Sequence, residues 1–302
     1  MVVFLNQRGQ GMIRLCASLF FLLSFVFPSV SHAALSIDLK KTGTAQGVSI
    51  CDLTVAGEGV RTKKKVYLIN ENHPAPKKIL WLFHGFKPEG DPYAQSPMEF
   101  ILRWDLVRFC KKNDYMLIAP DMGATLYPMD GFEDAGKISD MRWLKEAFGS
   151  LVFEKHKRTG VVLIGVSTGV EGSIKFASVI SNFGVSADSI VAFSGTYDFF
   201  TIDQGTGEYR IHKYLFGEMK DNLNVWRSEN LMESLKRLSR TRLYLYCESN
   251  SIYRKQAEDL RDQRLANIEI ADMLNLGKGF SHSWTFWGNP AVVKSLHSIL
   301  LQ

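Results

Sequence analysis

The stretch that decides the fold is Val161-Val162-Leu163-Ile164-Gly165-Val166-Ser167-Thr168-Gly169, in which an apolar run leads directly into a Gly-x-Ser-x-Gly turn. The run lacks polar residues, as is typical of a strand covered on both faces. A helical pattern follows over residues 170–181. A serine between a buried strand and a helix, with glycine two residues to either side, is the sequence context of a nucleophile elbow. Ser167 is therefore the candidate nucleophile.

The same alternation of apolar runs and helical patterns continues in both directions from this turn. It predicts a mostly parallel central sheet with helices on both faces, which is an α/β fold. The last helix is expected to begin at Asn289-Pro290, an N-cap residue followed by proline. The predicted strands are 66–69, 79–83, 116–119, 161–164, 190–193, 243–246 and 268–274, and the predicted helices are 98–113, 138–158, 170–181, 224–238 and 253–266.

A second motif lies about 80 residues before the serine, where the apolar strand 79–83 ends in His84-Gly85-Phe86. A serine hydrolase needs two backbone N–H groups to hold the oxyanion that forms during acyl transfer. One comes from the residue after the nucleophile, here Thr168, and the other from the loop after an earlier strand. We assign the second donor to Phe86 and expect His84 to hold the loop by hydrogen bonds.

The candidate general base is His282, in the segment Gly279-Phe280-Ser281-His282-Ser283-Trp284. It follows the last predicted strand and precedes the last helix. A histidine is expected at this point when the catalytic residues follow the chain order serine, acid, histidine. The chain has seven histidines, and most of them lack such a context.

Two carboxylates compete for the role of the acid that orients this histidine. Glu248 is the nearest carboxylate after the predicted strand 243–246, and Asp198 follows the predicted strand 190–193. We favour Glu248, because the later strand is the commoner donor in this chain order. Asp198 stays open as the alternative, since an aspartate after a strand also commonly stabilises a turn.

The segment 201–226 interrupts the strand–helix alternation and contains three glycines and several aromatic residues. We interpret it as a probable insertion near the active site, because loops at the carboxyl ends of parallel strands shape the ligand pocket. The aromatic side chains nearby suggest an apolar or sugar-stacking pocket. These side chains are Phe86, Tyr197, Phe199, Phe200 and Trp284.

Residues 1–33 have the composition of a secretory signal peptide, with basic Arg8 and Arg14, a short apolar run and a small-residue exit at Ala33. The run is shorter than the roughly 20 residues that a membrane span needs. We therefore expect an exported protein, periplasmic or secreted, without a stable membrane span after cleavage. Residues 34–302 are expected to form a single domain, and the oligomeric state stays open.

Composition narrows the classes of partner. Loss of residues 1–33 lowers the formal net charge from +5 to +3, which is too weak to indicate nucleic-acid binding. Cys51, Cys110 and Cys247 remain, and their spacing leaves open whether any two form a disulfide. No contiguous metal-ligand motif is present, so neither a metal nor an organic cofactor is expected for the reaction.

The chain resembles the esterase D-like α/β-hydrolases, which include S-formylglutathione hydrolases, feruloyl esterases and mycolyltransferases. The resemblance covers roughly residues 64–300 and is carried by HGF at 84–86, GVSTG at 165–169, FSGTYDF at 193–199, YLFGEM at 214–219 and SHSWTFWG at 281–288. It implies the α/β-hydrolase fold, the Ser167 nucleophile, the His282 base and an acid after the strand 243–246. The chain departs from the family pattern there, because Glu248-Ser249-Asn250-Ser251 stands where a typical member has Gly-x-x-Asp.

These observations predict a serine carboxylesterase that acts through an acyl-enzyme on Ser167. Its substrate would be a small-molecule ester or a glycan or lipid ester. An acyltransferase would use the same residues with an alcohol in place of water, and a peptidase on this fold is a weaker option. A non-catalytic envelope binding protein is the alternative from another class, and the missing aspartate motivates it.

Overall fold

The computed structural model describes residues 35–57, 59–87, 95–129, 138–238, 241–248, 251–265, 268–275 and 280–302. The predicted signal peptide lies outside the described residues. Leu35–Gln302 forms one compact unit. In the described part of this unit, no helix is both long and apolar enough to cross a bilayer.

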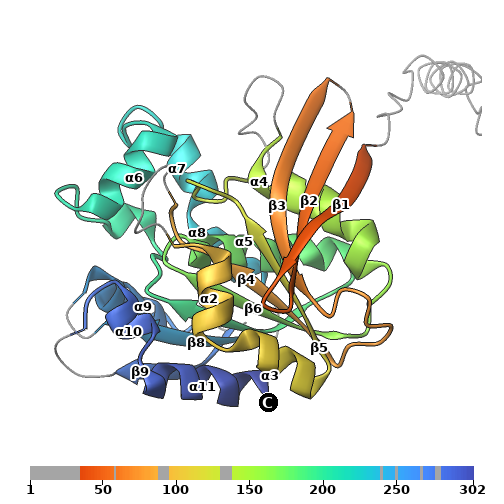
Figure 1. Ribbon diagram of the computed structural model, residues 1–302. Helices are drawn as coiled ribbons and strands as arrows, with labels where there is room; N and C mark the ends of the chain where they lie inside the picture. Colours follow the sequence, from red (N-terminus) through yellow and green to blue (C-terminus); the bar gives the residue numbers. More distant parts are fainter. Residues whose placement is uncertain are drawn as a thin grey trace, which may run out of the picture. The chain divides into compact units, whose positions relative to one another are not determined.

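The unit is built around a nine-stranded sheet with the order β1-β2-β3-β5-β4-β6-β7-β8-β9 (Figure 1). Strands β5, β4, β6, β7, β8 and β9 are parallel to one another, whereas β1, β2 and β3 form an antiparallel extension on the β5 side. The strands are β1 (Ser36–Ala45), β2 (Val48–Gly57), β3 (Val60–Ile69), β4 (Lys78–Phe83), β5 (Tyr115–Asp121), β6 (Gly160–Val166), β7 (Ala187–Phe193), β8 (Thr241–Cys247) and β9 (Ile268–Asn275).

The sheet is covered by helices on both faces, as expected. Helices α2, α3, α10 and α11 cover one face, and α4, α5, α8 and α9 cover the other (Figure 1). The helices are α2 (Pro97–Arg103), α3 (Leu106–Asn113), α4 (Asp140–Phe148), α5 (Gly169–Ile180), α6 (Gly207–Phe216), α7 (Leu223–Glu229), α8 (Leu231–Arg237), α9 (Ile252–Asp262), α10 (Trp284–Trp287) and α11 (Pro290–Leu300).

Strand β4 shows why the central strands read as unbroken apolar runs. Trp81 and Phe83 pack into the core on the α5 side, whereas Leu80 and Leu82 pack into the core on the α11 side. All four are fully buried, because successive side chains of a strand point to opposite faces and both faces are covered here. The predicted α/β fold with a mostly parallel sheet is confirmed.

The segment 201–226, which we interpreted as an insertion, belongs to the connection between β7 and β8. It contains α6 and the first part of α7, and a 3-10 turn at Phe199–Thr201 precedes it. Trp226 is fully buried and donates its indole N–H to Gly217 O at 3.0 Å. This bond joins the end of α6 to α7, so the connection is anchored by packed aromatic side chains rather than being an open loop.

Candidate active site

The Gly-x-Ser-x-Gly turn joins β6 to α5 through a left-handed serine. Ser167 has φ of 54°, a backbone region that non-glycine residues seldom occupy. Its N–H donates to Phe193 O of the neighbouring strand β7 at 2.8 Å. A Cβ on Gly165 would lie 2.5 Å from Gly169 O, and a Cβ on Gly169 would lie 2.1 Å from Phe83 O. Both glycines are therefore required by close backbone approach.

The turn lies at the switch point of the sheet. Strands β4 and β6 are parallel neighbours, yet the chain leaves β4 toward β5 on one side and reaches β6 on the other. The loops after β4 and β6 therefore diverge, and ligands of open α/β sheets bind in the crevice that such loops leave at the carboxyl ends of the strands. The His84-Gly85-Phe86 loop follows β4 and the serine follows β6, so both predicted motifs come from this point.

The β4 loop packs directly against the nucleophile. A Cβ on Gly85 would lie 3.0 Å from Ser167 Cβ, so a larger residue would press on the serine. Within the described residues, the amides of Phe86 and Thr168 donate to no protein acceptor. Thr168 is also the N-cap of α5, where the helix dipole favours negative charge. These two amides are available for the oxyanion role that the sequence assigned to them.

His84 holds this loop through both ring nitrogens. Nδ1 donates to Gly85 O at 2.6 Å, and Nε2 accepts from Met122 N–H at 2.8 Å. The ring is fully buried, and this burial lowers its pKa to about 4, although the nearby Asp121 opposes the shift. His84 is therefore neutral at physiological pH, and its arrangement matches the structural role expected for it.

Because His84 binds a proton in the unfolded chain before it does so in the folded one, stability should fall as the pH drops from about 6.5 toward 4. Urea unfolding at pH 7 and pH 5 should show this loss in the wild type. His84→Gln should be less stable at pH 7 but should lose less stability on going to pH 5. An equal loss in both proteins would remove His84 as the source of the pH dependence.

His282 and Glu248 complete a chain of hydrogen bonds that ends on the serine. His282 Nε2 lies 2.9 Å from Ser167 Oγ, and His282 Nδ1 lies 3.1 Å from Glu248 Oε1. The serine is 8% exposed and the glutamate 2% exposed. A base within hydrogen-bond reach of the nucleophile, and itself oriented by a third group, is the geometry of a catalytic triad.

The carboxylate of Glu248 is held by two further donors. Ser194 Oγ donates to Oε1 at 2.8 Å, and Ser251 Oγ donates to Oε2 at 3.2 Å. Burial raises the pKa of Glu248, whereas the hydrogen bond and charge of His282 and the hydrogen bond from Ser194 lower it. The lowering effects are the larger, so the net pKa is below its ordinary value. Glu248 is thus kept ionised, as the partner of an imidazolium must be.

The alternative acid Asp198 is engaged elsewhere. Its side chain caps the 3-10 turn through Phe200 N–H at 3.1 Å and accepts from Asn230 Nδ2 at 2.9 Å. This is the turn-stabilising role that a post-strand aspartate commonly has. The structure therefore brings together Ser167, His282 and Glu248, and it leaves Asp198 in a capping position between two helical segments.

The sequence indicated only some of the residues that support the triad, because Trp287 lies in the family motif at 281–288 whereas Tyr253 lies in no motif. The Tyr253 ring stacks on the His282 ring with centroids 4.5 Å apart, and Trp287 contacts the same ring edge-on at 4.9 Å. Trp287 also donates its indole N–H to Ser194 Oγ at 3.4 Å. Ser194 was visible in the family motif at 193–199, but nothing in the local sequence linked Tyr253 to a histidine 29 residues later.

The expected aromatic pocket does not include all five of the aromatic side chains assigned to it. Tyr197 and Phe199 are buried, at 2% and 0% exposure, and Phe199 packs against His212 and Phe216. For these two residues the pocket interpretation is wrong, because they fill the core beneath α6. Phe200 is exposed, and Phe86 and Trp284 are half-buried.

The three cysteines of the described residues form no disulfide. Cys51, Cys110 and Cys247 are all buried and free. Cys51 lies on β2, Cys110 on α3 and Cys247 on β8. They act as small apolar side chains of the two cores.

Comparison with known proteins identifies the fold. No family model and no curated protein sequence matches the chain. Among solved structures, an S-formylglutathione hydrolase from Agrobacterium tumefaciens is similar with a TM-score of 0.59 and 13% identity, over 87% of this chain and 97% of that one. The fluorophosphonate-binding serine hydrolase FphF from Staphylococcus aureus is similar with a TM-score of 0.56 and 13% identity, over 84% of this chain and 99% of that one.

A larger protein contains the same fold as one part. The acylaminoacyl peptidase of Pyrococcus horikoshii is similar with a TM-score of 0.57 and 12% identity, over 94% of this chain and 42% of that one. The fold is thus that of the α/β-hydrolases, as the resemblance implied, and the neighbours include an S-formylglutathione hydrolase and a serine hydrolase. At such identities the similarity shows the fold, and the chemistry must come from the site.

Proposed function

We propose that this protein is a serine hydrolase that cleaves small carboxylic esters through an acyl-enzyme on Ser167. The observation that carries the proposal is the continuous chain Ser167–His282–Glu248, with distances of 2.9 and 3.1 Å, behind a left-handed serine at the start of α5. The solved neighbours that are hydrolases and esterases support the same reaction class.

Each group has a definite task in the proposed reaction. His282 Nε2 takes the proton of Ser167 as Oγ attacks the ester carbonyl, and Glu248 stabilises the imidazolium that forms. The amides of Thr168 and Phe86 hold the oxyanion. The imidazolium then gives its proton to the leaving alcohol, and a water molecule repeats the sequence to release the acid.

We further propose that the enzyme is exported. The support is the composition of residues 1–33, with a basic start, an apolar run and a small-residue exit at Ala33. Fractionation of producing cells, with N-terminal sequencing of the product, tests this point. A mature chain that begins near Ala34 in the exported fraction supports it, whereas a chain that retains Met1 in the cytoplasm contradicts it.

A fluorophosphonate probe tests the hydrolase proposal, because it phosphonylates only a serine that a neighbouring base activates. We expect the folded wild type to be labelled at one site, and peptide mass spectrometry should place the label on Ser167. Ser173→Ala, which removes another buried hydroxyl on α5, is the matched control and should be labelled like the wild type.

Turnover of an ester panel then separates the alternatives. Acetyl, long-chain acyl and feruloyl esters define the acyl group, and added alcohols reveal an acyltransferase by formation of a new ester. A folded wild type that neither takes up the probe nor cleaves any ester would overturn the proposal in favour of a binding protein.

A further inference from the structure

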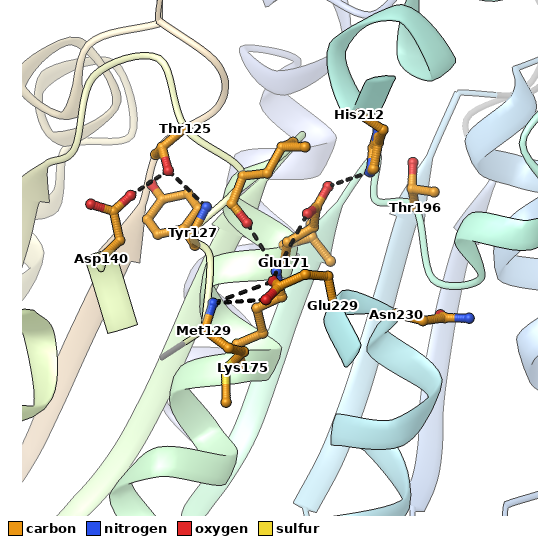
Figure 2. A network of polar contacts seen from close by, with 12 residues as sticks. Thr125, Tyr127, Met129, Asp140, Glu171, Lys175, Thr196, His212, Glu229 and Asn230 are labelled. Atoms are coloured by element: carbon orange, nitrogen blue, oxygen red, sulfur yellow. Dashed lines mark hydrogen bonds and ion pairs between the residues drawn. The ribbon is translucent and has the colours of Figure 1, made fainter. Parts of the chain in front are cut away.

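A group of charged side chains lies buried on and around α5, the helix that follows Ser167. Glu171 and Lys175 come from α5, Glu208 and His212 from α6, and Glu229 from the end of α7. None of the five is more than 7% exposed, and Glu171, Lys175 and His212 are fully buried. Figure 2 shows Glu171 between His212 on one side and Lys175 with Glu229 on the other. The proposed ester hydrolysis uses none of them.

Lys175 and Glu229 satisfy one another. Lys175 Nζ donates to Glu229 Oε2 at 2.7 Å and to Leu126 O at 3.0 Å. The Glu229 carboxylate also accepts from Met129 N–H, at 3.1 and 3.3 Å to its two oxygens. This pair is neutral overall and accounts for its own polar atoms, so the remaining charges must be balanced among Glu171, Glu208 and His212.

The contact between His212 and an ionised Glu171 lacks a proton donor when the imidazole is neutral. His212 Nδ1 lies 2.9 Å from Glu208 O, and because a carbonyl can only accept, Nδ1 carries the hydrogen. The lone pair of Nε2 then faces Glu171 Oε1 at 3.2 Å. Among the described residues, neither Glu171 oxygen accepts a hydrogen bond, and Nε2 makes none. Lys175 Nζ lies 3.9 Å from Glu171 Oε2.

Glu208 brings a second carboxylate to the same place. Its two oxygens accept from Thr196 Oγ1 at 2.9 Å and from the Tyr253 hydroxyl at 3.0 Å. One ligand atom each from Glu171, Glu208 and His212 lie within 4.8 Å of one another. Buried carboxylates need compensating charge. A protonated His212 would balance one of the two, whereas a divalent cation on neutral His212 would balance both.

We propose that Glu171, Glu208 and His212 bind a divalent transition-metal ion, such as Zn²⁺ or Mn²⁺, with water completing the coordination. Ligand atoms about 2.0–2.2 Å from a metal lie roughly 3–3.5 Å apart, which matches the 3.2 Å between Nε2 and Oε1. Imidazole with two carboxylates suits first-row ions better than Mg²⁺ or Ca²⁺, which take oxygen ligands. The Nδ1 contact to a carbonyl is the outer-shell bond that a metal-bound histidine usually makes.

A bound ion would support the position of His282 indirectly, through Glu208 and Tyr253. Tyr253 donates to Glu208 and stacks on the His282 ring, so an ion that fixes Glu208 also fixes the platform under the general base. The proposal does not depend on esterase activity, because the three ligands and their charges are independent of Ser167. Its role is structural, since no ligand touches the reacting atoms.

Metal content and thermal unfolding of the purified protein test the site. We expect about one equivalent of metal by plasma mass spectrometry after growth with added Zn²⁺ or Mn²⁺. Removal by a chelator should lower Tm, and Zn²⁺, Mn²⁺ or Co²⁺ should raise it again by about 5 °C, as expected for saturation of a folded-state site. Mg²⁺ and Ca²⁺ should not. Bound Co²⁺ should show a visible absorption band that His212→Ala lacks.

Three variants separate a metal site from a buried ion pair. Glu171→Gln and His212→Ala should lose the bound metal and the metal-dependent rise in Tm. Glu229→Gln is the matched control, because it removes a buried carboxylate from the Lys175 pair and should lower stability while keeping one equivalent of metal.

Three results would overturn the proposal. Wild type that binds none of the three ions would make His212 and Glu171 an imidazolium–carboxylate pair, and unchanged metal content in both ligand variants would place the metal elsewhere. If the ligand variants do not fold, the metal-dependent change in Tm and the Co²⁺ spectrum of the wild type still test whether the protein binds a metal ion. A preference for Ca²⁺ would contradict the ligand class.

Discussion

Ser167→Ala is expected to lower ester hydrolysis by about five to six orders of magnitude, because loss of a triad nucleophile removes the acyl-enzyme route altogether. The fold should survive the change. Ser167 is only 8% exposed but loses a single oxygen atom, and its strained φ of 54° is imposed by the strand–helix turn rather than by the hydroxyl. The comparison is of kcat/KM on the best ester of the panel, with Tm measured on the same preparations.

Ser173→Ala is the control for this experiment. Its hydroxyl is also buried on α5, but it donates to Val170 O at 2.8 Å and touches neither His282 nor Glu248. We expect kcat/KM within about threefold of the wild type, since only a local helix bond is lost. If Ser167→Ala keeps more than a hundredth of the wild-type activity, the proposed nucleophile is wrong.

The sequence predicts those parts of this molecule that are encoded locally. A buried parallel strand needs an apolar run, and a nucleophile elbow needs its serine and glycines within five residues, so β6, Ser167 and α5 were readable from one stretch. The strands β1 and β2 were missed because most side chains of β1 are exposed and those of β2 alternate, so neither forms an apolar run. The predicted helix 98–113 is divided in two at Asp105, which has φ of 52°.

The rest of the site depends on contacts between distant segments. The choice between Glu248 and Asp198 needed the loop geometry, because both follow parallel strands. The approach of Glu171 to His212, 41 residues apart on two helices, also has no contiguous motif. The polar support of the triad, from Ser194 and Ser251, arises in the same way. Local sequence and chain order therefore indicate Ser167 and His282, whereas the choice of the acid and the groups that orient it depend on the assembled sheet.

Glu248→Gln is expected to lower kcat about 10³- to 10⁴-fold, because an amide facing His282 favours the wrong imidazole tautomer and cannot stabilise the cation. Asp198→Asn is the matched control. Its side chain caps a turn and contacts Asn230 rather than His282, so activity should stay within about threefold while stability falls by roughly 0.5–1 kcal/mol. A larger kcat loss for Asp198→Asn than for Glu248→Gln would reverse the assignment of the acid.

A double variant can move the acid back to the position typical of the esterase D-like pattern. Ser251 stands where that pattern has aspartate, and its Oγ already lies 3.2 Å from Glu248 Oε2. Ser251 is also the N-cap of α9, a position that aspartate fills equally well. Glu248→Ala with Ser251→Asp should therefore recover about 10- to 100-fold of the kcat that Glu248→Ala alone loses, since a carboxylate is again available to the imidazolium.

Ser251→Asp in the wild-type background supplies the remaining comparison. It places a second carboxylate beside Glu248, and repulsion between the two should lower stability instead of raising kcat. Rescue in the double variant together with this penalty in the single variant would mean that the carboxylate has changed its place in the chain while the geometry around His282 has stayed the same. Without rescue, the longer glutamate side chain would itself be required, because only it reaches Nδ1 from position 248.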